Sequence, residues 1–386
     1  MKKRLLLVLL VVSFIFVSSC VPKEAVEDSD QAAQGPNAEI SPTLIQEEPN
    51  QEEPSKEIKN TSPQPQTETK SSKCLSNISP TFTKPFTDIT KIRSIAPPGG
   101  IAVGSQSRSY VFAKAYENGS YPNVPIYAPI DSTLEGITYA MRGSSPKGRP
   151  EYRLDFRASC EVTYSLDHIP YVIDKIKNAG PTTPASHTRT GAYVSIPVSA
   201  GELIGYTDAV LVPGFDFYLF NYAKLVTHIN PVRWTSDHNT RADCPYDYFP
   251  DELKTLYYSY FASAGGTKQN NPTCRSASRD VAGTLSGGWF LGSSTDMQGS
   301  RLLVGSDFGD FVDFVIDREN QPRFSVRDYK GKNPEDVKAG DTVCYSDTDR
   351  NTHAYLKLLS DNELAVSAGQ GQCPGELPSG YEIWNR

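Results

Sequence analysis

The sequence predicts a mainly β protein: a β-barrel or sandwich domain, a C-terminal antiparallel β module, and one amphipathic helix between them. Three observations support this. Many short segments alternate apolar and polar residues, as half-buried strands do. Glycine and other turn formers separate those segments at short intervals. One stretch, after residue 250, has a clear helical period of apolar residues.

Residues 1–20 have the features of a secretory signal peptide. Three basic residues at positions 2–4 precede an apolar run from Leu5 to Val17, which is short for a membrane span. An uncleaved N-terminal anchor is the alternative. The sequence Val17-Ser-Ser-Cys20 resembles the bacterial lipobox, and this resemblance implies that Cys20 carries a lipid. Several acyl chains would then hold the protein at a membrane.

Residues 21–77 are predicted to be a disordered acidic and proline-rich tether. Between Val21 and Lys73 there is no aromatic residue, and eleven acidic residues against five lysines leave a net charge of −6. Such a segment buries too little apolar surface to offset its ordering entropy. Removing this −6 and the +3 of the signal from the total of −7 leaves −4 for residues 74–386. No basic stripe is present, so we expect no nucleic-acid partner.

The remaining cysteines indicate an exported protein. Six cysteines besides Cys20 are compatible with disulfides, although the sequence alone allows many pairings. Proximity favours Cys244–Cys274 and Cys344–Cys373, which leaves Cys74–Cys160. Zinc ligation by these cysteines is the alternative, but no C-x-x-C spacing occurs.

Residues 78–225 are predicted to form the first β domain. Its centre is the stretch 124–217, after a loop-rich lead-in, and Tyr171–Lys177 is compatible with a helical turn. Its short strands and tight turns are expected within Ser109–Phe112, Val124–Asp131, Tyr152–Phe156, Cys160–Tyr164, Ile196–Gly205 and Phe215–Asn221.

Residues 226–280 are predicted to connect the two β regions and to hold a helix over 250–263. Its apolar face is Leu253, Leu256, Tyr257, Tyr260 and Phe261, which we expect to pack in a core. Residues 281–386 are predicted to form the C-terminal β module. Its expected strands are Gly287–Leu291, Arg301–Val304, Phe311–Ile316, Arg323–Val326, Thr342–Tyr345, Tyr355–Leu359 and Glu363–Val366.

The order of segments in 124–217 resembles the lysostaphin-type, or LytM-like, peptidoglycan metalloendopeptidases, which are built on the duplicated hybrid motif. Their V-x-A-P-x-D-G-like turn is matched by Ile126-Tyr-Ala-Pro-Ile-Asp-Ser132, and their V-x-x-G-x-x-I-G turn by Val198–Gly205. Their closing His-x-His-Phe is matched in position by Phe215–Tyr218. The resemblance covers about 100 residues and implies a duplicated-hybrid-motif β domain.

The zinc ligands of that family are missing at the matching positions. The family's H-x-x-x-D pair falls on Ala113 and Glu117, and its His-x-His pair falls on Phe215 and Phe217. A phenyl ring has no lone pair for a metal, and Asp216 should point to the opposite strand face from its neighbours. We therefore expect no catalytic residues, no metal and no cofactor.

The other histidines of the chain do not supply the missing zinc ligands in any spacing typical of a zinc site. His168, expected just after a strand, is a loose match to a family catalytic histidine, and a hydrogen-bonded loop histidine is the plainer interpretation. His187 lies in a polar loop, and His353 is expected in a turn. A rebuilt zinc site from His168, His187 and Glu117 is conceivable, but their spacing does not call for one.

The resemblance implies a membrane-anchored lipoprotein of the cell envelope with a degenerate peptidase domain that binds peptidoglycan, another glycan or a protein partner. A divergent zinc endopeptidase and a structural spacer are the alternatives. The chain also has 21 tyrosines and three tryptophans, Trp234, Trp289 and Trp384. Some of these rings could form a surface on which glycans stack.

Overall fold

The computed structural model describes residues 74–99, 107–143, 148–186, 191–263, 266–268, 272–292, 300–307, 311–317, 323–327, 329, 331–347 and 351–386. The predicted signal peptide, the lipid anchor at Cys20 and nearly all of the tether lie outside these residues. None of the helices described is long and apolar enough to cross a membrane.

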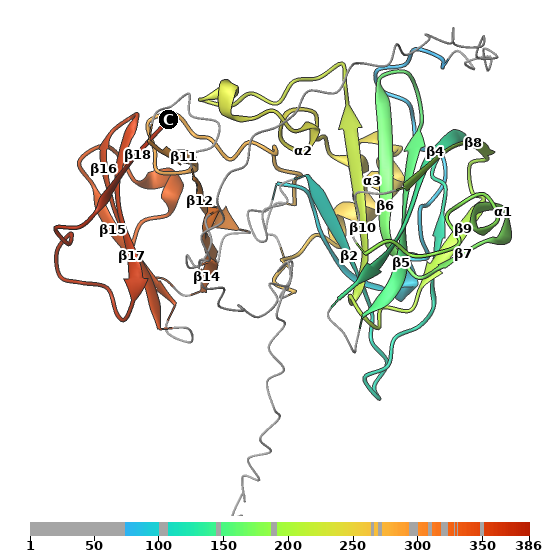
Figure 1. Ribbon diagram of the computed structural model, residues 1–386, viewed down its shortest axis with the longest axis horizontal. Coiled ribbons are helices and arrows are strands. Elements are labelled where there is room, and N and C mark those ends of the chain that lie inside the picture. Colours follow the sequence, from blue (N-terminus) through green and yellow to red (C-terminus); the bar gives the residue numbers. More distant parts are fainter. Residues whose placement is uncertain are drawn as a thin grey trace, which may run out of the picture. The chain divides into compact units, whose positions relative to one another are not determined.

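The described residues are mainly β, and strands that pair in the same sheet do so antiparallel. The first sheet has seven strands in the order β1-β2-β10-β6-β5-β4-β8, several of which are labelled in Figure 1. They are β1 (Ile92–Ala96), β2 (Arg108–Ala113), β4 (Ser132–Arg142), β5 (Arg149–Arg157), β6 (Val162–Ile169), β8 (Gly191–Val198) and β10 (Gly214–Asn221).

A smaller sheet of three strands shares a core with the first sheet. It consists of β3 (Val124–Tyr127), β9 (Leu203–Thr207) and β7 (Tyr171–Val172) in the order β3-β9-β7. Val124, Ile126 and Ile204 of this sheet belong to one buried cluster with inward-facing residues of the large sheet, among them Phe215 and Phe217. The expected helical turn over 171–177 is thus split into strand β7 and the short helix α1 (Asp174–Lys177).

The segment after β10 completes this first core. It contains η3 (Pro231–Arg233), α2 (Asp237–Thr240), η4 (Pro245–Tyr248) and α3 (Asp251–Ser259), and η1 (Ile89–Lys91) precedes β1. Helix α3 is shorter than the predicted 250–263. It ends because Phe261 forms a β-bridge with Ile95 and the Ala262 amide donates to the Ile95 carbonyl. Tyr257 and Phe261 are buried as expected, whereas Leu256 remains 37% exposed.

Residues 287–385 form an eight-stranded sheet whose end strands β14 and β15 lie next to each other, so the sheet is a nearly closed barrel. The order is β14-β13-β12-β11-β18-β17-β16-β15. The strands are β11 (Gly287–Leu291), β12 (Arg301–Asp307), β13 (Phe311–Asp317), β14 (Arg323–Arg327), β15 (Thr342–Asp347), β16 (Thr352–Ser360), β17 (Glu363–Gln370) and β18 (Glu382–Asn385), with η5 (Pro334–Asp336) between β14 and β15.

All seven predicted strands are present in this barrel, but β18 was not predicted. Its four residues are too few to show a period, and β18 joins β11 to β17. His353 was expected in a turn, but it lies in β16 and is buried. Trp289 and Trp384 fill the barrel core, and Trp234 packs against Phe290. None of the three tryptophans therefore provides a glycan-stacking surface.

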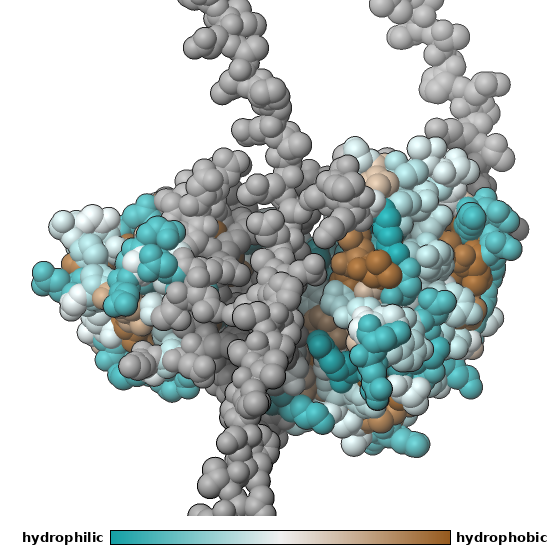
Figure 2. Space-filling view, turned by 90° about the horizontal axis from the view of Figure 1, so that it is seen from below, coloured by the Kyte–Doolittle hydropathy of each residue, from teal (hydrophilic) through white to brown (hydrophobic). Residues whose placement is uncertain are grey.

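Three disulfides connect Cys74 with Cys160, Cys244 with Cys274, and Cys344 with Cys373. This is the pairing that proximity in the sequence favoured, and it leaves none of the six cysteines for zinc. On the face shown in Figure 2, the described surface is largely hydrophilic with separate apolar patches. The exposed large apolar residues include several tyrosines, and Tyr193 on β8 is 99% exposed.

A candidate charged centre on the large sheet

Strand β10 divides its side chains between two environments. Phe215 and Phe217 point into the aromatic core, where the Phe217 ring lies 4.9 Å from the ring of Phe86. Side chains alternate along a strand, so Asp216 and Tyr218 lie on the opposite face. Asp216 is completely buried nonetheless. The two phenylalanines at the family's zinc-ligand positions are therefore core residues, and the polar chemistry of β10 is on the other face.

Two carboxylates meet on that face. Asp216 on β10 pairs directly with Asp167 on β6 in the sheet register. Like charges at directly opposed positions destabilise a sheet unless cations lie between or beside them. Arg142 supplies one such cation, because its Nη2 donates to both carboxylate oxygens of Asp167 at 2.6 and 2.7 Å. Arg108 supplies another, with its Nη1 3.6 Å from Oδ2 of Asp216.

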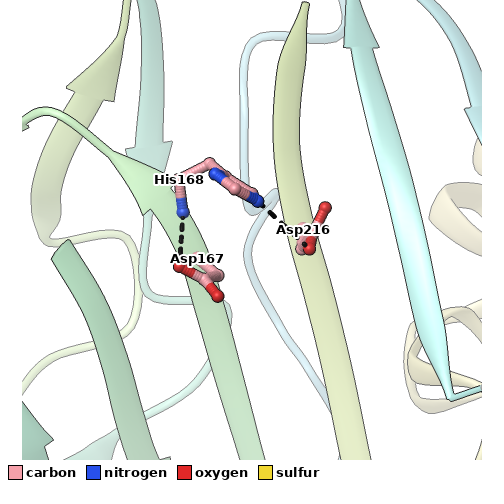
Figure 3. A group of neighbouring side chains, drawn as sticks. All are labelled: Asp167, His168 and Asp216. Carbon is pink, nitrogen blue, oxygen red and sulfur yellow. Dashed lines mark hydrogen bonds and ion pairs between the residues drawn. The ribbon is translucent and has the colours of Figure 1, made fainter. Parts of the chain in front are cut away.

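His168 supplies the third cation through an unusual backbone conformation. Strict alternation after Asp167 would turn His168 toward the core. Instead its φ is 63°, in the left-handed region that residues other than glycine seldom adopt. The register between β5 and β6 also shifts here, between Tyr152 and Leu154. Irregularities of this kind re-aim side chains. As a result, the His168 ring extends toward Asp216 (Figure 3).

The ring nitrogens of His168 both face carboxylates. Nδ1 lies 2.8 Å from Oε2 of Glu151, and Nε2 lies 3.7 Å from Oδ2 of Asp216. The backbone amide of His168 donates to Oδ1 of Asp167 at 2.8 Å. Glu151 is itself bound by Arg149, whose guanidinium also forms two bonds with Asp208. The histidine is thus surrounded by acids on three sides.

These contacts set the protonation of the centre. Burial by itself lowers the pKa of His168, but the carboxylates of Asp216, Glu151 and Asp167 outweigh it and raise this pKa to about 9. Burial also dominates at Asp216, whose pKa is raised although His168 and Arg108 oppose the change. For Asp167 the pKa is lowered, because His168 and the arginines outweigh its burial.

Acidic and basic side chains alternate in the centre. The carboxyl groups of Glu151, Asp167 and Asp216 lie beside His168, Arg108, Arg142 and Arg149. Oδ2 of Asp216 also accepts from the hydroxyl of Tyr218 at 3.1 Å, while its Oδ1 has no hydrogen-bond partner. Among the described residues, Asp167, His168 and Asp216 are the one group of three with the spacing of metal ligands.

This donor set suits an ion-pair cluster better than a metal centre. A metal binds the neutral imidazole through a lone pair, whereas a histidine with a pKa near 9 carries protons on both nitrogens at neutral pH. Both oxygens of Asp167 already accept hydrogen bonds from Arg142. A bound cation would have to displace a proton and compete with two guanidinium groups.

The other predicted positions lie apart from this centre. Ala113 is buried at the end of β2, and Glu117 is exposed in the turn after it. His168 was expected after a strand, but it lies within β6. His187 is outside the described residues. Sequence reasoning foresaw the orientation of Asp216 but missed its partners, because the pairing of β6 with β10 joins positions 49 residues apart.

Two further histidines have separate surroundings. His228 stacks on Trp234 with ring centroids 4.6 Å apart and lies 3.7 Å from Oδ2 of Asp280. His238 lies on the same sheet face as Tyr218 and forms a 2.6 Å hydrogen bond with the hydroxyl of Ser107. Burial and the nearby arginines lower the pKa of His238 to about 4, so it is neutral at physiological pH. Neither histidine joins the charged centre.

No family model matches this sequence, and no curated protein or solved structure is similar enough to count as a match.

Proposed function

We propose that this chain is an exported, lipid-anchored protein of the cell envelope whose first β domain is LytM-like and acts by binding rather than by hydrolysis. Its ligand would be a cell-wall glycan or another envelope component. The lipid anchor is Cys20, and the three disulfides support an oxidising compartment outside the cytosol.

The pairing of the two motif turns supports the LytM-like assignment. Residues 124–127, just before and at the start of the first motif, pair with residues 203–207, in and just after the second. The turns that follow are also joined, because the Ala128 amide donates to the Glu202 carbonyl and the Gly201 amide donates to the Ala128 carbonyl. Asp131 accepts a further bond from the amide of Ala200 at 2.7 Å. Two segments that match one family's turns are therefore neighbours, as one β domain requires.

The state of the charged centre is the observation that carries the non-catalytic assignment. A zinc peptidase needs three ligands with free lone pairs and an open position for water. Here Nδ1 of His168 is bound to Glu151, both oxygens of Asp167 are bound by Arg142, and Asp216 is buried beside Arg108. A buried cluster of this kind holds two neighbouring strands together.

The metal content of the purified full chain tests this proposal. After dialysis against trace zinc, we expect no stoichiometric metal in the wild type and no difference in His168→Ala. About one zinc per chain, lost in His168→Ala, would instead establish the divergent zinc endopeptidase.

Sedimentation with isolated cell walls tests the binding role. We expect the full chain to sediment with the walls and to leave them undegraded. If the chain stays in the supernatant at every wall concentration, the structural-spacer alternative replaces the binding role.

A further inference from the structure

A polar pocket opens on the same sheet face as the charged centre. Its volume is about 370 Å³, and strands β4, β5, β6 and β10 and the start of α2 contribute to its walls. This size is within the range of small-molecule sites, roughly 300–1,000 Å³. The walls include Glu135, Arg153, Asp155, Phe220, Tyr222 and Asp237.

Most of the charge around this pocket is already compensated. Arg153 Nε donates to Oδ1 of Asp155 at 3.0 Å, and Arg157 Nε, next to the pocket, donates to Glu135 at 2.7 Å. Three carboxylates against two guanidinium groups leave a net charge of −1, which belongs to Asp237. A small net charge of this kind selects weakly for ionic ligands.

Hydrogen-bond donors and acceptors lie next to each other in the pocket. Asp155 accepts from Arg153 and also from the hydroxyl of Ser165 at 2.5 Å. The Tyr222 hydroxyl donates to Oδ2 of Asp237 at 3.1 Å. Each hydroxyl of a sugar is both a donor and an acceptor, so a sugar ring needs alternating groups like these.

Aromatic rings lie next to these polar groups. Phe220 and the 42% exposed Tyr222 both line the pocket. The ring of Phe220 is held edge to face by His238, with centroids 5.0 Å apart. Aromatic faces offer apolar contact to the C–H groups of a sugar while their neighbours bind its hydroxyls.

We propose that this pocket binds a ring of a neutral glycan. The inference rests on the proposed binding function and names its site and its ligand class. Tyr222 would stack on the sugar, and Asp155 and Asp237 would accept hydrogen bonds from its hydroxyls. A cationic peptide is the competing ligand class, and the nearly balanced charge of the walls favours the glycan.

Competition for cell-wall binding by the full chain provides the test. Chitotetraose, a neutral oligosaccharide, is the probe, and the variants are Tyr222→Ala and Asp237→Asn. Tyr193→Ala is the matched control, because Tyr193 is a fully exposed tyrosine that does not line the pocket. Near-ultraviolet circular dichroism shows whether each variant is folded. If Tyr222→Ala does not fold, Tyr222→Leu, which fills the space but has no aromatic face, takes its place.

We expect chitotetraose to compete with the walls, and Tyr222→Ala to weaken binding about tenfold or more. We expect Asp237→Asn to weaken it less and Tyr193→Ala to leave it unchanged. Binding should change less than about twofold between about 0.05 and 0.5 M salt, since a neutral ligand is not screened.

Other outcomes overturn the inference and separate it from the proposed function. Wall binding that is unchanged in both Tyr222→Ala and Asp237→Asn places the site elsewhere, while the binding function stands. Two results would instead make the ligand a cationic peptide. In the first, binding needs Tyr222 but chitotetraose does not compete with it; in the second, binding falls steeply as the salt concentration rises. A wild-type chain that does not bind walls at all removes the proposed function itself.

Discussion

Replacing His168 by asparagine tests the assignment of the charged centre. Asparagine tolerates the left-handed backbone found at His168 (φ 63°), so the exchange removes the charge without adding strain. It leaves Asp216 and Glu151, which are almost completely buried, without their shared cation. Removing one partner of a buried ion pair typically destabilises a protein by about 3–5 kcal/mol.

The pKa of His168 gives an independent magnitude and its pH window. A folded-state pKa of about 9 against an ordinary value of 6.5 corresponds to about 3 kcal/mol. Because the folded pKa is the higher one, this stabilisation is complete below about pH 6.5 and is lost as the pH rises through about 9. His168 is only 13% exposed, so solvent screening reduces the figure little.

Urea unfolding of wild type and His168→Asn at several pH values measures this contribution. The free energy of unfolding should differ by about 3 kcal/mol at pH ~6 and by much less at pH ~9.5. Comparing the two proteins at each pH cancels the titrating groups that do not interact with His168. A difference that stays constant over this range would refute the assignment of a protonated histidine.

A double-mutant cycle with Asp216→Asn separates the ion pair from general damage to the fold. The double variant removes both charges of the pair. Its loss of unfolding free energy should therefore be smaller than the sum of the two single losses by about 1–3 kcal/mol. Additive effects would show that His168 and Asp216 do not interact.

Two further predictions concern the first core and its crosslinks. Phe217→Ala should destabilise the fold by about 3–5 kcal/mol in chemical unfolding, because Phe217 is buried among aromatic rings, whereas Tyr193→Ala should stay within about 0.5 kcal/mol. Equal effects of the two would contradict the observed orientation of β10. Replacing Cys244 and Cys274 together by serine should remove about 3–4 kcal/mol for a loop of 30 residues, and no change in the unfolding midpoint would count against this disulfide.

Local patterns in the sequence located most strands of the C-terminal barrel, whereas in the first β domain β1, β4 and most of β8 were not predicted. Alternation located the strands of the C-terminal barrel, because β11, β12, β13, β15, β16 and β17 each place apolar residues in the barrel core. The same alternation foresaw that Asp216 faces away from Phe215 and Phe217. Neighbouring cysteines indicated the disulfides, since short loops bring them together readily. These features depend on a few consecutive residues or on a short separation.

Tertiary structure alone decided the rest. Helix α3 ends where Phe261 forms a β-bridge with Ile95 and the Ala262 amide donates to the Ile95 carbonyl, about 165 residues away in sequence. The charged centre depends on strand order, on a register shift and on one left-handed residue. None of these leaves a periodic signal in the sequence, because each arises from contacts between distant segments. Sequence reasoning therefore singled out His168 and Asp216 but not Arg108, Arg142, Glu151 or Asp167, which the fold brings to them.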